Sequence, residues 1–405
     1  MQSSDRLHAL DAVRAFALLS GIALHAAQPF LAGLPWVTVE SPSNVLAAVW
    51  YTIHMFRMPL FFLIAGFFAR MTLERRGLAG FVKDRLRRIL VPLVVGLPIV
   101  MLLTGVALVL GTLATGADPR SLQAVRPPPS ADHHDLFPTI NLIHLWFLYY
   151  LLIFYAGALI VRSACTSMPA PIARLQGAVD AAVRFAMRGI WGPLLLALPV
   201  ATYFYQLQSW AIWGGLPAPF SLVPDFGALI GYGLFFGFGW LLHRQEHLLR
   251  SLEGRWLFYG VLAIALWAVC RIIGGATPHW EPHARNTELV VYTVSYIMAA
   301  WCWSFGLIGV SIRYLSGYSS LRRYLADSSY WLYLMHIPAL FFFGQILHPL
   351  PWHWSLKYPL SITGAMSLLL LSYHYLVRFT IVGATLNGRR HPRLKRELPQ
   401  ATTVG

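Results

Sequence analysis

An arginine and a histidine interrupt the first apolar stretch of the chain, LDAVRAFALLSGIALH, which runs from residue 10 to residue 25. Arg14 and His25 are eleven residues apart, so on a helix they return almost to the same face, roughly 16 Å from each other along the axis. A histidine titrates near neutral pH and can take a proton from a hydroxyl group. We predict that His25 is a catalytic base and that Arg14 lies on the same polar path.

Three further histidines and a second arginine lie inside later apolar stretches. His54 and Arg57 share a helix face, and His144 and His336 belong to two other stretches. At 1.5 Å per residue, the four histidines fall roughly 6 to 15 Å below the outer membrane surface. Because buried polar side chains turn toward the interior of a bundle, we expect His54, Arg57, His144 and His336 to line a substrate cavity. The alternative for each histidine is a core side chain with a single hydrogen bond. No H-x-x-x-H spacing occurs, so we expect no metal site.

The arginines fall into two groups. Arg14 and Arg57 lie within apolar stretches, where either a cavity role or a structural ion pair fits them, and Asp11 is the obvious partner for Arg14. Arg85 and Arg88 stand at the start of the third stretch. Clustered arginines suit phosphate groups, which they bind through bidentate hydrogen bonds. The alternative for this second group is a role in membrane topology and lipid headgroup binding.

The composition identifies the class of protein that must position these side chains. Of the 405 residues, 57% are hydrophobic and only 12% are charged, about half the charged fraction of a soluble protein. Apolar runs near 20 residues recur along the chain, which indicates an all-α, polytopic transmembrane helical bundle. The net charge of +15 comes from short loops rather than one basic domain, so we expect no nucleic-acid partner. The three cysteines are too few and too scattered for a disulfide framework or a zinc site.

Hydropathy predicts about ten spans, near residues 10–32, 45–69, 89–113, 140–161, 190–207, 225–243, 256–275, 288–312, 326–347 and 357–380. The fifth is the least regular, because Pro193 and Pro199 interrupt it. With both termini in the cytoplasm, the inner segments hold 23 basic residues and the outer loops hold four. This asymmetry is a strong positive-inside signal.

The remaining segments allow simpler expectations. Residues 1–385 are predicted to form one transmembrane domain, and 386–405 a basic cytoplasmic tail. The loop 114–139 is rich in proline and polar residues and is expected to be an irregular lid or a connector. Residues 172–188 carry apolar residues on one helix face and arginines elsewhere, as a helix on the cytoplasmic membrane surface would. The sixth span contains five glycines, which we interpret as contacts for close helix packing.

These residues resemble the motifs of the acyltransferase-3 family of membrane acyltransferases. The match begins with LDAVRAFALLSGIALH and continues with HMFRMPLFFLIAGFFAR. The segments KDRLRRILVP, HLWFL and SSYWLYLMHIP complete the series. The first two spans are most similar to the branch that succinylates osmoregulated periplasmic glucans. The resemblance covers nearly the whole chain.

The resemblance implies an O-acyltransferase of the bacterial inner membrane. Such enzymes take an acyl group from a cytoplasmic acyl-CoA co-substrate, with no permanently bound cofactor, and place it on a hydroxyl of a periplasmic glycan. By motif match, His25 would be the catalytic histidine and Arg14 its essential companion, while Arg85 and Arg88 would bind the donor. The membrane lipids are the remaining expected partners. No fused esterase-like domain is expected, since only a basic tail follows the last span. The acyl group, succinyl or acetyl, stays open at this point.

A secondary transporter or flippase of a polar or glycan-linked solute is the alternative from another functional class. Ten helices, proline breaks and polar groups at membrane depth would suit it. Against it, the sequence has no paired half-sequences and few carboxylates within the spans for ion coupling. A structural scaffold would leave the charges at membrane depth without a purpose.

Overall fold

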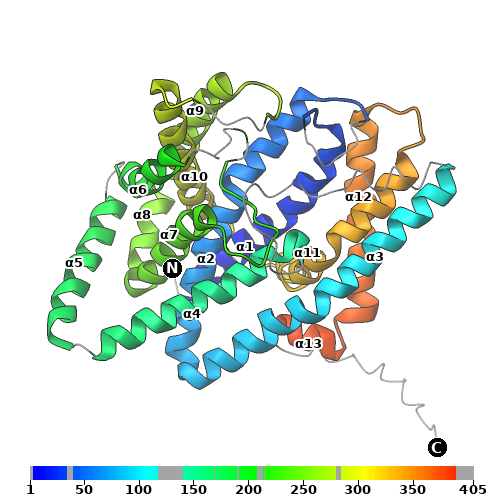
Figure 1. The fold of residues 1–405 in the computed structure, drawn as a ribbon. Helices are drawn as coiled ribbons and strands as arrows, with labels where there is room; N and C mark the ends of the chain where they lie inside the picture. The colour runs from blue at the N-terminus through cyan, green and yellow to red at the C-terminus, as the bar shows by residue number, and fades with distance from the viewer. Residues whose placement is uncertain are drawn as a thin grey trace, which may run out of the picture.

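A computed structural model describes residues 3–33, 40–116, 140–167, 169–188, 191–207, 213, 215–279 and 284–388. This part of the chain is helical, without strands, which confirms the predicted fold class (Figure 1). The α-helices are α1 (Ser3–Ala27), α2 (Asn44–Arg85), α3 (Val91–Thr115), α4 (Trp146–Ser167), α5 (Pro169–Arg188), α6 (Gly192–Gln206), α7 (Phe226–Leu242), α8 (Leu249–Glu253), α9 (Trp256–Gly274), α10 (Thr287–Tyr314), α11 (Ser320–Leu347), α12 (Trp354–Ser372) and α13 (Ile381–Asn387). Shorter 3₁₀ turns are η1 (Gln28–Phe30), η4 (Ile143–Leu145) and η6 (His243–Leu248), and two π-helical turns are η2 (Leu86–Leu90) and η7 (Tyr373–Val377).

Eight segments of the described chain are long and apolar enough to cross a membrane, or nine if the bent pair α5–α6 counts as one span. The expected number was ten. One segment, Asn44–Leu113, has 70 residues, so as a straight helix it would be more than three times as long as the bilayer is thick. It holds the second and third expected spans, and Gly77, with φ 67°, breaks the helix between them. The fifth expected span stays a prediction, because α6 has 15 residues and reaches about 22 Å, and it counts as a crossing only together with α5.

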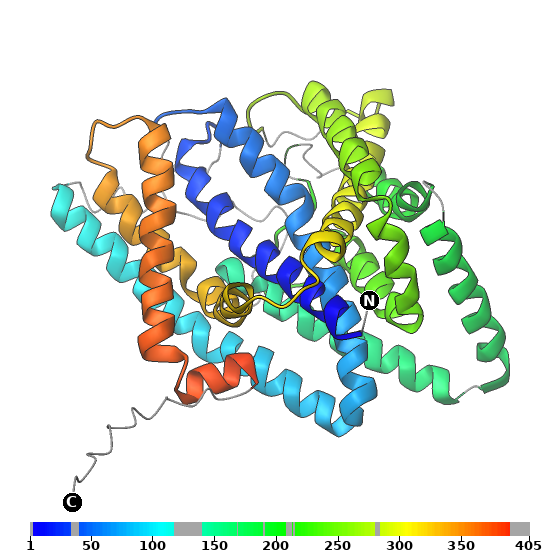
Figure 2. The same ribbon diagram turned by 180° about the vertical axis from the view of Figure 1, so that it is seen from behind.

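The bundle has two ends, which we name by landmarks. At the α1–α2 end, the loops after α1, α9 and α11 gather, and Glu40 pairs with both His348 and Lys357 there, at 2.9 and 2.8 Å. At the Gly77 end lie the break in α2 and the short helix α13 (Figures 1 and 2). Within the bundle, α1 packs against α2, α10, α11 and α12, and α10 is the most buried of the candidate spans.

Two glycines bring α2 and α7 into close contact. A Cβ atom at Gly66 would overlap the carbonyl oxygen of Phe236, and one at Gly239 would overlap that of Leu63. Because neither glycine has a side chain, the backbones of the two helices come into direct contact, as small residues allow in membrane bundles. This confirms close packing by the glycines of the sixth span at Gly239, whereas Gly237 has open space around its Cβ position.

We expect Gly239→Ala to lower the thermal unfolding midpoint of the protein in detergent. The new methyl group meets backbone, which cannot move aside, and overpacking of this kind costs about 1–3 kcal/mol. Gly237→Ala is the matched control, two residues away on the same helix, and should leave the midpoint unchanged or raise it. Equal midpoints for the two variants would contradict the close contact.

Helix α5 ends at Arg188, as the sequence predicted for the amphipathic segment 172–188. Its inner face carries Val183 and Met187, both buried, and Asp180 pairs with Arg244 at 2.7 Å. Phe185 is 65% exposed. The helix itself is confirmed, and its place on a membrane surface stays a prediction. Residues 117–139 and 389–405, which contain most of the expected lid and of the basic tail, lie outside the described residues.

Candidate active site

Three histidine rings from three separate elements meet near the α1–α2 end. The ring centroids of His25 and His336 lie 5.1 Å apart, and those of His336 and His144 lie 4.6 Å apart. His25 belongs to α1, His144 to η4 and His336 to α11. His144 and His336 are buried, and His25 is half-buried. The structure thus brings together three of the four histidines that the sequence places at similar depth, and we call these three the histidine cluster.

A proline in α11 explains how two of the rings are held. Pro338 has no N–H, so the carbonyl group of Leu334, one turn earlier, has no helical partner. Nε2 of His144 donates to the carbonyl oxygens of Tyr333, at 3.0 Å, and Leu334, at 3.3 Å. Nδ1 of His336 donates to the same Tyr333 oxygen at 2.6 Å, and the Tyr333 hydroxyl donates to the carbonyl oxygen of His144 at 2.8 Å. The turn of α11 before Pro338 thus holds both rings.

The turn that carries His144 is strained. Ile143, the preceding residue, has φ 49°, in the left-handed region that β-branched residues rarely adopt. The side chain of Asn141 accepts a hydrogen bond from the Ile143 amide at 2.8 Å and stabilises the turn. Strain of this kind costs about 1–3 kcal/mol and clusters at functional sites. Its position, next to a ring of the histidine cluster, fits that pattern.

Hydrogen bonds leave one free ring nitrogen on each member of the cluster. Nδ1 of His25 donates to Oε1 of Gln28 at 3.2 Å. Among the described residues, no partner contacts Nε2 of His25, Nε2 of His336 or Nδ1 of His144. In a neutral imidazole whose other nitrogen carries the proton, the free nitrogen has a lone pair. An imidazole held as the ring of His25 is held can accept a proton at Nε2.

Arg57 lies against α1, next to the histidine cluster. A Cβ atom at Gly21 would overlap Nη1 of Arg57, so the guanidinium occupies the space that this glycine leaves. The positive charge lies within electrostatic range of His25, His144 and His336. Nε of Arg57 has no hydrogen-bond partner in the described part of the chain. A cation held this way, close to a base, is suited to stabilise a negative charge that develops on a substrate.

His54 flanks the cluster without joining its ring contacts. Its ring stacks on Trp50, with 4.7 Å between the centroids and 18° between the planes. Arg57 also lies within electrostatic range of this ring. His54 is half-buried, so it borders the site from α2.

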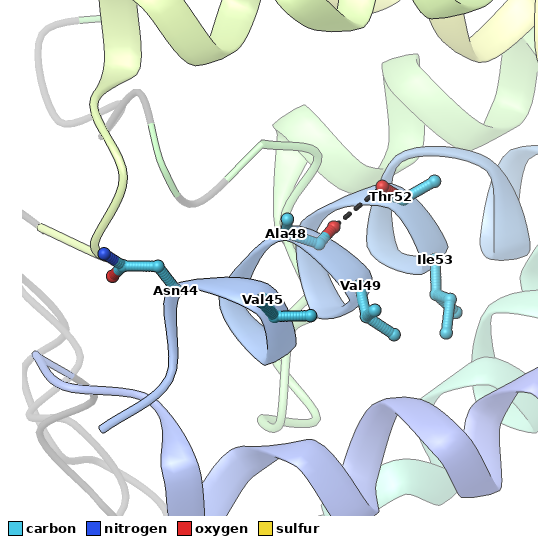
Figure 3. A pocket seen from close by; sticks show the side chains of 6 residues that line it. All are labelled: Asn44, Val45, Ala48, Val49, Thr52 and Ile53. Carbon is cyan, nitrogen blue, oxygen red and sulfur yellow. Dashed lines mark hydrogen bonds between the residues drawn. The ribbon is translucent and has the colours of Figure 1, made fainter. Parts of the chain in front are cut away.

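A groove runs along α2 toward Arg57. It has a volume of about 550 Å³ and is lined by Asn44, Val45, Ala48, Val49, Thr52 and Ile53 (Figure 3). Val45, Val49 and Ile53 lie on one helix face, and Arg57 is the next residue of that face. The groove therefore leads from the α1–α2 end to the turn before Arg57.

A second polar cluster lies at the Gly77 end, where α2 passes into η2. Asp84 is buried and binds Arg76 at 2.8 Å, Arg85 at 3.2 Å and Arg88 at 4.0 Å. Arg85 also donates to the hydroxyl groups of Thr72, at 3.1 Å, and Tyr155, at 3.3 Å. One carboxylate thus faces three arginines, and the cluster keeps a surplus of positive charge. We call these four charged residues the arginine cluster.

Arg88 and Arg14 extend this cluster toward the middle of the bundle. Nε of Arg88 donates to the carbonyl oxygen of Leu386 at 3.2 Å. Arg14 forms an ion pair with Asp11 at 3.0 Å and lies within electrostatic range of Arg88. The expected partner of Arg14 is therefore confirmed. Since Arg14 and His25 are eleven residues apart on α1, the helix carries one of them at each cluster, roughly 16 Å apart.

Sequence reasoning missed three residues of the site: Gln28, Gly21 and Asp84. The spacing His25-x-x-Gln28 and the run DRLRR around Asp84 were visible as signals. Gly21 carried no signal, because its role depends on a side chain of another helix. Across the described ranges, no group of three or more His, Cys, Asp or Glu residues is arranged to hold a metal ion.

Comparison with known proteins assigns the chain to a family. The acyltransferase domain of the acyltransferase-3 family matches residues 7–374. The chain belongs to the acyltransferase-3 family. It is therefore a multi-pass membrane O-acyltransferase, which confirms the resemblance drawn from its motifs.

The family relatives cover the full chain at low identity. Glucans biosynthesis protein C of Salmonella typhimurium (strain LT2) is 24% identical over 99% of both chains. The proteins of the same name from Escherichia coli (strain SMS-3-5) and Shigella dysenteriae serotype 1 are each 22% identical over 98% of both chains. No solved structure matches the chain.

Proposed function

We propose that this acyltransferase moves a succinyl or acetyl group from a cytoplasmic acyl-CoA to a hydroxyl group of a periplasmic glycan, in the bacterial inner membrane. The observation that carries the proposal is the pair formed by the unpartnered Nε2 of His25 and the neighbouring Arg57. The glycan acceptor is supported by the name of the full-length relatives, glucans biosynthesis protein C. Succinyl follows from the branch resemblance, and acetyl is the alternative.

The two clusters suit the two ends of such a reaction. Acyl-CoA is anionic at its nucleotide end, which suits the arginine cluster, where Arg85 and Arg88 would bind its phosphate groups and Arg14 would add charge. The positive-inside pattern supports a cytoplasmic location of that end. The slender pantetheine arm would extend between the helices to His25. The acceptor would approach from the periplasmic α1–α2 end, where His54, His144 and His336 would border it and the groove on α2 leads inward.

In the chemical step, the acyl group moves from the thioester sulfur of the donor to the hydroxyl oxygen of the acceptor. Nε2 of His25 takes the proton of the acceptor hydroxyl as that oxygen attacks the thioester carbonyl carbon. The carbonyl oxygen becomes negatively charged, and the guanidinium of Arg57 stabilises it. When the intermediate collapses, the carbon–sulfur bond breaks, the ester is released, and the thiolate of coenzyme A takes the proton from His25. Atoms and charges balance without a metal or an oxidant.

The test is mass spectrometry of cell-envelope glycans from cells that contain or lack the protein, paired with membranes supplied with labelled acyl-CoA. We expect a mass increase of one or more succinyl or acetyl units, and ester label that depends on the protein. Transport of solute without an ester would instead identify the secondary transporter alternative. Ester formation on a non-glycan acceptor would keep the acyl transfer and overturn the proposed acceptor.

A further inference from the structure

Gly21 stands where α1 and α2 come together beside the histidine cluster. It is buried, and a Cβ atom at this position would overlap Nη1 of Arg57, with Cζ at 3.3 Å and Cδ at 3.7 Å. Gly21 and His25 are four residues apart on α1, so they lie on the same face, one turn from each other. The guanidinium of Arg57 therefore packs against α1 one helical turn from His25.

The backbone of α1 does not require a glycine here. Residue 21 lies inside a regular helix and is not among the described residues with positive φ. Glycine in a helix interior costs about 1 kcal/mol relative to alanine. The three nearest atoms that an alanine methyl group would meet all belong to the side chain of Arg57. The shape of α1 at this residue is thus matched to a side chain of another helix.

Among the described residues, no carboxylate forms an ion pair with the guanidinium of Arg57. Its Nε has no hydrogen-bond partner in this part of the chain either. By contrast, Arg14, Arg85 and Arg88 each contact a carboxylate. The position of the Arg57 charge relative to His25 therefore depends on the space at Gly21.

We infer that Gly21 is a positioning residue: it forms a notch in α1 that sets the guanidinium of Arg57 beside His25, where the oxyanion of the acyl transfer develops. The inference rests on the proposed function for its chemical meaning. The notch itself is a statement about two residues that can be tested without catalysis.

The experiment is a double-mutant cycle of the wild type, Gly21→Ala, Arg57→Lys and the double variant. Lysine keeps the charge at residue 57 and removes the planar group that fills the notch. We expect Gly21→Ala to lower kcat about 100-fold, since a displacement near 1 Å at a reacting centre costs about that much, with the KM for acyl-CoA unchanged. In the Arg57→Lys background, the same substitution should lower kcat less than threefold.

Thermal midpoints of the same four proteins give a readout besides activity. Alanine at residue 21 favours the helix, and the atom it displaces is the far end of a flexible side chain, so the variant should fold. We expect Gly21→Ala to raise the midpoint more in the Arg57→Lys background than in the wild type. Gly105→Ala, on α3 with open space around its Cβ position, is the control and should leave kcat unchanged.

Three outcomes would overturn the inference. The first is full activity of Gly21→Ala in membranes where the wild type is active. The second is an equal loss of kcat in both backgrounds, because the glycine would then act through another group. The third is that the changes in thermal midpoint caused by the two single substitutions add up in the double variant. If the wild type itself transfers no acyl group, the proposed function fails, and the midpoints alone decide whether the notch exists.

Discussion

Replacement of His25 with alanine is expected to lower the rate of acyl transfer about 10³-fold or more. The protein should still insert into the membrane at wild-type levels. The reason for the lower rate is that Nε2 of His25 is the free nitrogen of a ring whose Nδ1 is held by Gln28 at 3.2 Å. General-base catalysis contributes about 10²–10⁴ to a rate, and the neighbouring rings of His144 and His336 donate to α11 rather than to this position. The measurement is ester formation from labelled acyl-CoA in membranes that contain equal amounts of each protein.

The matched control is His374→Ala. His374 lies in η7, at the end of the last span, and its ring contacts Tyr324 and Phe379 rather than the histidine cluster. It should retain near wild-type transfer. Incubation with labelled donor and no acceptor adds a second reading. Label that stays covalently on wild-type protein and is absent from His25→Ala would show that His25 carries the acyl group rather than acting as a base. Wild-type transfer by His25→Ala would remove His25 from the mechanism.

Loss of Arg85 and Arg88 together is expected to raise the KM for acyl-CoA about 100-fold or more, with a smaller effect on kcat. A hydrogen bond to a charged group contributes about 1.5–3 kcal/mol, so two lost phosphate contacts account for an effect of this size. Steady-state kinetics against acyl-CoA concentration measures it. Arg87→Ala is the matched control, because Arg87 lies in the same π-helical turn with an exposed side chain.

The double substitution also removes two of the three arginines that face the buried Asp84. Arg88→Gln therefore serves as a second variant, since it keeps Arg85 with its contacts to Thr72 and Tyr155. We expect it to raise the KM about tenfold at an unchanged protein level. A fall in protein level with an unchanged KM in both variants would assign the arginine cluster to topology and folding.

The sequence predicted that the histidines of the cluster lie at similar depth, because depth in a membrane follows from the number of residues counted from the end of a span. His25, His144 and His336 each stand a countable number of residues from a span boundary, and their polarity turns them inward. The spacing of Arg14 and His25 did not predict that the two residues have different neighbours. They share a face of α1, yet one belongs with Asp11 and Arg88 and the other with His336.

Contacts between helices explain what the sequence left out. The notch at Gly21 depends on the crossing of α1 and α2, and the anchoring of His144 depends on a carbonyl group freed by Pro338 on another helix. Hydropathy leaves α6 open, because its prolines and apolar residues suit a short helix as well as part of a broken crossing with α5. His54 was predicted to line the cavity, and its stacking on Trp50 sets it at the border of the cluster.

The placement of Arg14 and His25 at two levels of one rigid helix has a consequence for donor choice. The spacing between them is fixed by eleven residues of α1, so it does not adjust to the substrate. An activated acyl group on a short carrier, such as an acyl phosphate or an acyl adenylate, could not have its anionic part at the arginines and its carbonyl carbon at the histidine at once. If the donor binds as we propose, the fixed spacing along α1 would therefore select a donor by the length of the arm between its anionic part and its carbonyl carbon.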